Sequence, residues 1–180
     1  MSKIQPQKIT LKNGKTLTLR EAKIEDTEKL SNCIRSYLGD SEYLPKLPEE
    51  MKIDADPNWI KSYIESDNSL LLVAEYDNQI IGNIDATGSK RKAMEHTAVI
   101  GMGMLVEWRN LGLGKHLFET VIQWAKENPK LELLWLQVYT ENMAGITLYK
   151  KMGFIENGSI KNYFKQKGKY YDNLTMSLKL

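Results

Sequence analysis

Two kinds of hydrophobic periodicity follow one another along this chain. Residues 9–19 alternate apolar and polar positions on both sides of Asn13-Gly14, which is typical of a β-hairpin. Residues 26–38 instead repeat apolar side chains every three or four positions, as an amphipathic helix does. We expect this helix to be followed by Gly39 in the left-handed conformation that ends many helices.

Turn residues divide the rest of the chain into further strands and helices. Asp56-Pro57 predicts an N-cap and a first-turn proline for a short helix. The other expected elements are strands over 70–76, 79–86 and 96–104, a helix over 113–126, a strand over 131–138, a helix over 142–152 closed by Gly153, and a hairpin of strands over 154–160 and 170–180. The apolar run 131–138 predicts a central strand covered on both faces. Together these elements predict a mixed α/β sheet with helices on both faces.

Length and composition narrow the class of protein. A chain of 180 residues predicts one domain over 1–180, and a net charge of +2 argues against a general nucleic-acid-binding surface. No apolar run approaches the roughly 20 residues that span a bilayer, and the first residues lack a signal-peptide core, so we expect a cytoplasmic protein without a membrane anchor. Cys33 lies among apolar residues at helical spacing, which favours a buried structural thiol over a nucleophile. Because no histidine or cysteine stands at ligand spacing, we expect no metal site.

The most informative segment is the glycine-rich turn between the strand ending at 104 and the helix starting at 113. It reads Arg109-Asn110-Leu111-Gly112-Leu113-Gly114-Lys115, and such a turn at a helix N-terminus binds phosphate through converging backbone N–H groups. A P-loop is excluded because His116 follows Lys115, and a dinucleotide fingerprint is excluded because Val106 stands where its third glycine belongs. A tight turn that binds no ligand stays open on this segment alone.

A second segment, Glu141–Phe154, begins about 28 residues further on. With the glycine turn it resembles the acetyl-coenzyme A (acetyl-CoA) signature of the GCN5-related N-acetyltransferases, the GNAT family: RxxGxG, then Asn-xxx-Ile-x-Leu-Tyr-xxx-Gly-Phe. The order of elements from about residue 16 is similar as well, and residues 96–102 are similar to a branch that acts on small amines and amino acids. The resemblance implies a central, mostly antiparallel sheet with helices on both faces, and acetyl transfer from acetyl-CoA to a primary amine.

The resemblance also implies which residues bind acetyl-CoA, in a core of about 96–158. The pyrophosphate is expected on the backbone N–H groups of 111–115, with Arg109 shaping the turn, and the pantetheine arm is expected to pair with the strand at 102–104. The implied binding residues are Met102, Gly103, Met104, Arg109, Asn110, Leu111, Gly112, Leu113, Gly114, Lys115 and Asn142. Several have a second interpretation: Lys115 as a solvated lysine, Asn142 as a helix N-cap, and Gly101 and Gly103 as packing positions under a helix.

For the chemistry, the resemblance implies that Tyr149 protonates the departing thiolate of coenzyme A. A phenol with a reference pKa near 10 carries that proton at neutral pH. Relatives that acetylate ribosomal-protein N-termini have a glutamate base where this chain has Gln137, and an amide cannot accept the proton. The general base is therefore not assigned, and its candidates are Glu95, His96 and Asp85.

The acceptor is the least determined part of the prediction. In the family that the chain resembles, the region after the first helix often lines the acceptor site, and here the segment Asp40–Asp56 holds six acidic residues against two lysines. This composition favours a cationic acceptor such as a polyamine, an aminoglycoside or a basic peptide, although an ordinary solvated loop has the same composition. Together with the similarity of residues 96–102, it predicts a small cationic amine or an amino acid. Two alternatives stay open: a protein or peptide N-acetyltransferase, and a non-catalytic acyl-CoA-binding regulatory module. The sequence determines no oligomeric state, and a homodimer stays open.

Overall fold

The computed structural model of the protein describes residues 3–41, 43–45 and 56–180. Within them eight strands form one sheet in the order β1-β2-β3-β4-β5-β6-β8-β7. The strands are β1 (Gln7–Thr10), β2 (Thr16–Glu21), β3 (Leu70–Tyr76), β4 (Gln79–Gly88), β5 (Thr97–Met104), β6 (Leu133–Tyr139), β7 (Ile155–Gln166) and β8 (Lys169–Lys179). Neighbouring strands of this sheet are antiparallel except for β5 and β6, which run parallel. This confirms the predicted mixed, mostly antiparallel sheet.

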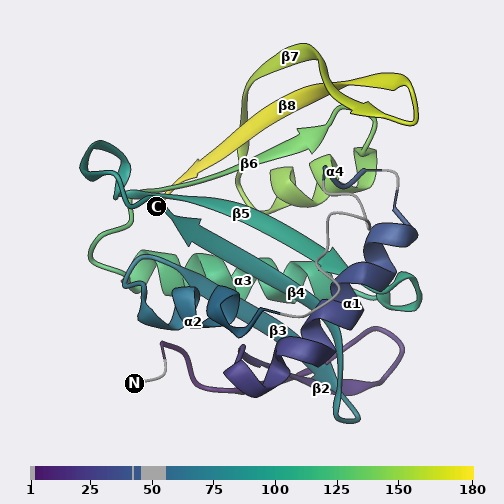
Figure 1. The fold of residues 1–180 in the computed structure, drawn as a ribbon, viewed down its shortest axis with the longest axis vertical. Helices are drawn as coiled ribbons and strands as arrows, with labels where there is room; N and C mark the ends of the chain where they lie inside the picture. The colour runs from purple at the N-terminus through teal and green to yellow at the C-terminus, as the bar shows by residue number, and fades with distance from the viewer. Residues whose placement is uncertain (1–2, 42, 46–55) are drawn as a thin grey trace.

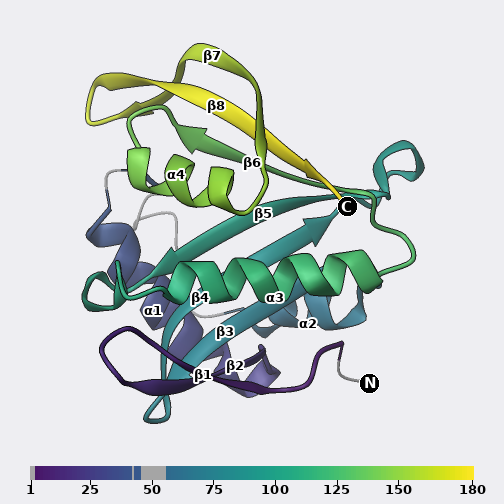
Figure 2. The same cartoon turned by 180° about the vertical axis from the view of Figure 1, so that it is seen from behind.

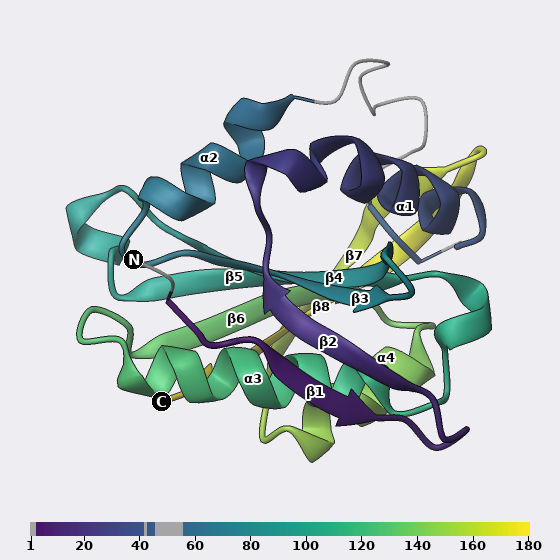
Figure 3. The ribbon, with the colours of Figure 1, turned by 90° about the horizontal axis from the view of Figure 1, so that it is seen from below.

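Helices cover both faces of the sheet, as Figures 1 and 2 show from opposite sides. The four α-helices of the described residues are α1 (Thr27–Gly39), α2 (Pro57–Glu65), α3 (Leu113–Glu127) and α4 (Met143–Lys151). Figure 3 shows α1 and α2 on one face and α3 and α4 on the other. In the described part of the chain, no helix is both long and apolar enough to cross a membrane.

A separate hydrophobic core lies under each pair of helices. Leu117 and Phe118 of α3 are completely buried against the inner strands, and Leu30 of α1 and Ile60 of α2 are buried against the opposite face. The sheet is therefore held from both sides, which fixes the positions of its central strands β4 and β5.

Most predicted turns and caps are confirmed because they depend on local chemistry. Gly14 has a φ of 81° in the first hairpin loop, and Gly153 has a φ of 92° after α4. Asp56 caps α2 by accepting a hydrogen bond from the backbone N–H of Asn58 at 2.9 Å, with Pro57 next to it in the first turn.

Three predictions differ from the structure. Gly39 is the last residue of α1 and keeps an ordinary negative φ. The final hairpin is longer, because β7 continues to Gln166 and turns at Lys167-Gly168. The expectation that the strand over 131–138 is covered on both faces is wrong: Leu136 is buried, but Gln137 is exposed. The reason is that α1 packs mainly against β4 and β5, and α2 mainly against β3, so this face of β6 is not covered by a helix along its length.

Gly103 of β5 is required by the packing of α1. A Cβ atom placed on Gly103 would lie 2.3 Å from two ring carbons of Tyr37, whose hydroxyl donates a 2.9 Å hydrogen bond to Asn83 Oδ1. Gly103→Ala should therefore displace a buried ring and lower the free energy of unfolding by about 1–3 kcal/mol. Urea denaturation measures this change.

The matched control is Gly39→Ala, where no atom lies within 4 Å of the added methyl group and φ is ordinary. We expect this control to keep or slightly raise stability, because alanine restricts the unfolded chain. Equal unfolding midpoints for the two variants would contradict the packing argument.

Candidate active site

The central feature of the site is that β5 and β6 pair over only three residues each. The pairs are Thr97–Leu133, Ala98–Leu134 and Val99–Trp135, although β5 continues to Met104 and β6 to Tyr139. Beyond Val99 the two strands diverge, as Figure 1 shows. One edge of β5 is therefore left without a neighbouring strand in the middle of the sheet.

The register with β4 decides which backbone groups lie on that open edge. The N–H of Leu105 donates to the carbonyl of Ile81 at 3.0 Å, so alternation along an antiparallel pair turns the groups of Gly103 toward β4 as well. Those of Met102 and Met104 point the other way, toward the divergence. Such an edge can pair with an extended chain that carries amide groups.

The glycine turn lies directly after this edge. Asn110 and Gly112 both have positive φ, 62° and 96°, and α3 begins at Leu113. The first N–H groups of α3 have no acceptor in the helix, so the turn presents donors at the positive end of the helix dipole. Arg109 fixes the entry to the turn, because its guanidinium donates to the carbonyl of Met104 at 3.4 Å.

Two lysines border the turn in different ways. Lys115 forms an exposed ion pair with Glu119 at 3.4 Å on the next turn of α3. Lys12 comes from the loop between β1 and β2: its N–H donates to the carbonyl of Leu111 at 3.1 Å, and its Cε lies 4.0 Å from the Cβ position of Gly112. Sequence reasoning missed Lys12, because nothing in its local sequence shows that the first hairpin reaches residue 111.

The helix α4 is brought to the same place by close packing. Leu148 Cδ2 lies 3.0 Å from the Cβ position of Gly114. The methyl groups of Met102 and Met104 lie 3.4 and 3.5 Å from the same Cβ position. The structure thus gathers three segments that the sequence singled out separately: the edge of β5, the glycine turn and α4. Asn142 caps α4, accepting from the N–H of Gly145 at 3.0 Å, which confirms its structural role.

Tyr149 of α4 is half-buried on this face of the sheet. Its ring packs against Phe118 and Phe154, with centroids 5.3 and 6.4 Å away. Its hydroxyl makes no hydrogen bond to another residue of the described chain. Burial raises the pKa of Tyr149 to about 12, so the phenol stays protonated at neutral pH. It can therefore donate a proton to a stronger base.

On the opposite face, Asp85 of β4 lies beside β5. Tyr63 of α2 and Thr87 donate hydrogen bonds to its Oδ2 at 3.3 and 3.1 Å, and its register partner is Gly101. Burial raises the pKa of Asp85 to about 6, despite the two donors that stabilise the charge. The side chain is thus poised to change protonation near neutral pH.

The other two candidate bases lie elsewhere. Glu95 and His96 precede β5 at the end where it pairs with β6, and Glu95 is exposed. At about 3.3 Å per residue, His96 lies roughly 16 Å from Gly101 along the strand. Of the three candidates, the structure brings Asp85 nearest to the divergence of β5 and β6.

Polar side chains continue on that face of β6 and β8. Leu174 and Met176 face the α3 core, so their neighbours Asn173 and Thr175 point to the other side, and Gln137 pairs with Thr175. Asn173 is fully buried, and its Oδ1 is the one buried side-chain atom without a hydrogen-bond partner within residues 3–41, 43–45 and 56–180. An orphaned buried acceptor of this kind is rare in folded proteins.

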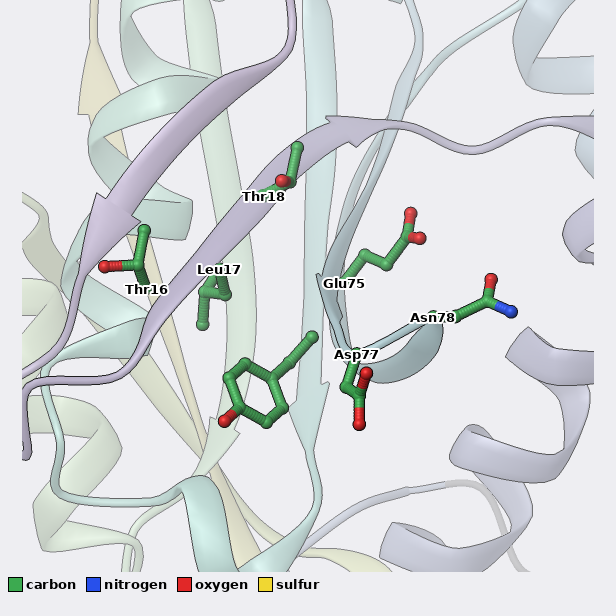
Figure 4. Close-up of a pocket in the computed structure, with 7 residues that line it drawn as sticks. Thr16, Leu17, Thr18, Glu75, Asp77 and Asn78 are labelled. Atoms are coloured by element: carbon green, nitrogen blue, oxygen red, sulfur yellow. The ribbon is translucent and has the colours of Figure 1, made fainter.

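Two further features do not take part in this arrangement. A shallow depression of about 470 Å³, shown in Figure 4, is lined by Thr16, Leu17, Thr18, Glu75, Tyr76, Asp77 and Asn78, two strands away from β5. Cys33 is buried in α1, and burial raises its pKa to about 12, so it is not a ready nucleophile. Among the described residues, no group of three or more histidine, cysteine, aspartate or glutamate side chains could hold a metal ion.

Comparison with known proteins identifies the family of the chain. The profile of the Acetyltransferase (GNAT) family matches residues 33–154. The L-amino acid N-acetyltransferase AaaT of Escherichia coli is 26% identical over 123 residues, covering 68% of this chain and 76% of that protein. An N-alpha-acetyltransferase of Sulfurisphaera tokodaii is 26% identical over 161 residues, covering 85% of this chain and 89% of that protein. The crystal structure of a GNAT-family acetyltransferase from Streptococcus pneumoniae superposes with a TM-score of 0.88 at 26% identity, covering 91% of this chain and 99% of that one.

The diverging parallel pair, the glycine turn and the family match define one class of protein. The chain belongs to the GNAT family of acetyltransferases. It is an acetyl-CoA-dependent acyltransferase, as the sequence resemblance implied.

The raised pKa of Asp85 has a consequence for stability. Because the pKa is about 6 in the folded protein and near 3.8 in the unfolded chain, the folded state binds the proton more tightly, and stability falls as pH rises from about 4 to 6. Asp85→Asn removes the cost of keeping an ionised carboxylate buried, so the thermal midpoint of this variant should exceed the wild-type value by a few degrees at pH 8.

The same comparison below pH 4 is the internal control, because both chains then carry a neutral side chain at position 85. We expect the difference in thermal midpoint to vanish there. A difference that is constant from pH 4 to 8 would contradict the assignment of the raised pKa to Asp85.

Proposed function

We propose that this protein transfers the acetyl group of acetyl-CoA to the primary amine of a small cationic amine or an amino acid, by direct attack of the amine. The observation that carries the proposal is the open edge of β5 between the glycine turn and Tyr149. An edge that can pair with amides, an anion site and a proton donor are the three features that a thioester on a diphosphate carrier requires.

The cosubstrate would be held along these elements, in a core of about 96–158. The N–H groups of 111–115 suit a diphosphate, and Arg109 keeps the turn in place through Met104. The backbone groups of Met102 and Met104 face the open edge and would pair with the pantetheine arm, and the Met104 carbonyl also accepts from Arg109. Asn142 keeps its side-chain amide nitrogen available, because the cap uses only its Oδ1. Acetyl-CoA supplies the activated thioester carbonyl.

Tyr149 is proposed as the general acid. Burial keeps its phenol protonated, and its helix lies against the glycine turn and the edge of β5. The phenol can give its proton to the thiolate sulfur as the C–S bond breaks, which removes the need to expel a free thiolate into an apolar site.

The acceptor is proposed to reach the divergence from the face of α1 and α2, because the glycine turn and α4 occupy the opposite face. The relatives act on different amines, one on L-amino acids and one on N-alpha groups, so a peptide acceptor is the second candidate. The acidic segment that favours a cationic acceptor lies mostly outside the described residues: Glu42, Glu49, Glu50 and Asp54. Asp56 is used as the cap of α2.

Release of free thiol from acetyl-CoA over a panel of polyamines, L-amino acids and peptides tests the proposal. We expect turnover on small amines, and a loss of kcat of roughly 10²-fold or more in Tyr149→Phe with the affinity for acetyl-CoA unchanged. Tyr163→Phe, on the exposed part of β7, is the matched control and should keep full activity.

Each alternative has a distinct result in this assay. Turnover on peptides but not on small amines would make a peptide, and not a small amine, the acceptor. Saturable acetyl-CoA binding without turnover on any amine would favour a non-catalytic acyl-CoA-binding module. Full activity of Tyr149→Phe would exclude Tyr149 as the acid.

Lys12 is proposed as a further phosphate contact, because it is the exposed cation beside Gly112. Lys12→Ala should raise the KM for acetyl-CoA about threefold to fivefold and leave kcat nearly unchanged, as expected for the loss of one exposed charge contact. Lys8→Ala on β1 is the control. A KM for acetyl-CoA of Lys12→Ala that equals the wild-type KM at both low and moderate salt would contradict this role.

A further inference from the structure

The two carboxylate oxygens of Asp85 have different surroundings. Both hydrogen bonds to this side chain, from Tyr63 and Thr87, end on Oδ2. Oδ1 makes no hydrogen bond within the described chain, yet it is absent from the buried atoms that lack a partner, of which Asn173 Oδ1 is the one case there. Oδ1 is therefore accessible and free to accept a proton or a hydrogen bond.

The free oxygen points toward β5. A Cβ atom on Gly101 would lie 2.9 Å from Oδ1, so no side chain of β5 comes between this oxygen and the strand. Gly101 is two residues beyond Val99, where the pairing with β6 ends. Asp85 thus faces the start of the open edge from the side of α1 and α2, while Tyr149 lies on the side of α3 and α4.

We propose that Asp85 is the proton acceptor of the reaction: Oδ1 takes the proton of the acceptor ammonium before its nitrogen attacks, while Tyr63 and Thr87 hold Oδ2. This inference rests on the proposed function, because it requires an amine acceptor. It names a residue and a side of the sheet that neither the family match nor the relatives assign.

The proton balance of the step is simple. One N–H bond of the ammonium breaks, one O–H bond forms at Oδ1, and a positive and a negative charge become a neutral amine and a neutral acid. An alkyl ammonium has a pKa near 10.4, so the base must be as strong as a carboxylate allows. The pKa of Asp85, about 6, makes this side chain a better proton acceptor than an exposed aspartate.

The groups around Asp85 keep the charge unpaired. Across the strands its register partners are Leu71 of β3 and Gly101 of β5, which carry no charge. The titratable groups that face it are Tyr63 of α2 and Tyr37 of α1, and burial next to this carboxyl raises the pKa of both phenols. No cation of the described chain pairs with Asp85, so an ammonium ion would be its complement.

Tyr63 and Thr87 are positioning residues in this scheme. Their hydroxyl groups lie 2.6 Å apart and both reach Oδ2, which orients the carboxyl group so that Oδ1 faces Gly101. Each hydrogen bond also lowers the pKa of Asp85 against the effect of burial. Removal of either donor should therefore raise that pKa.

The first test is Asp85→Asn, which keeps the shape and the acceptor for Tyr63 but cannot take a proton. With the best amine of the panel we expect kcat/KM at pH 7 to fall by about 10²–10⁴-fold, with acetyl-CoA affinity unchanged. Asp77→Asn, in the turn between β3 and β4, is the matched control and should match the wild type. A change within twofold for Asp85→Asn would overturn the proposal.

The second test separates a base from a structural carboxyl group. Carbon NMR of the aspartate carboxyl groups should show one that titrates near pH 6 and disappears in Asp85→Asn. Tyr63→Phe should raise this pKa and move the rising limb of the pH profile for kcat/KM to higher pH by the same amount. A limb that stays in place while the NMR pKa moves would overturn the assignment.

Gly101→Ala tests the geometry without removing the carboxyl group. Its methyl group would lie 2.9 Å from Oδ1, so we expect a large loss of kcat with acetyl-CoA binding retained. Wild-type kcat in this variant would contradict the role of Oδ1.

Failure of the inference differs from failure of the proposed function. If the wild type turns over no amine, the function itself is wrong. If it does, and Asp85→Asn is as active as the wild type, only the base is wrong.

Discussion

The site depends on the early end of one strand pairing. β5 and β6 form the parallel pair of the sheet, and their pairing stops after Val99–Trp135 although both strands continue. Backbone groups in the middle of a sheet are normally satisfied by the next strand, so an interruption there costs free energy unless a ligand replaces it. The family match indicates acetyl-CoA as the ligand of the protein, and its pairing with this edge is our proposal.

The interruption also separates two chemical environments. On one side of the sheet α3 and α4 place the glycine turn beside Tyr149, because Gly114 lets Leu148 approach to 3.0 Å from its Cβ position. On the other side α1 and α2 place Tyr37 over Gly103 and Tyr63 against Asp85. Alternation along β5 produces this division, since methionines 102 and 104 face one side and glycines 101 and 103 the other.

Burial raises the pKa of both Tyr149 and Asp85, but the consequence for proton transfer differs between the two groups. It raises the pKa of Tyr149 to about 12, which preserves a proton donor, and it raises the pKa of Asp85 to about 6, which creates a stronger proton acceptor. The same physical cause, loss of water around the charged form, thus suits one group to give a proton and the other to take one. The cost is stability, because an ionised Asp85 is held in a place that disfavours its charge.

The sequence by itself determined the features that depend on neighbouring residues. The Asp56 cap, the left-handed Gly153, the glycine turn of 109–115 and the Asn142–Tyr149 spacing are local, and together they were enough to indicate the fold, the family and the acyl donor. Tertiary structure decided the rest. Glu95, His96 and Asp85 were all candidates for the general base in the sequence. Only the register of β4 with β5 places Asp85 beside Gly101. Lys12 reaches residue 111 through a contact between segments 99 positions apart. The coverage of β6 was predicted incorrectly, because its apolar composition does not reveal that α1 packs mainly on β4 and β5 and α2 mainly on β3. Local propensities describe each element, whereas the juxtaposition of distant side chains depends on how the elements pack.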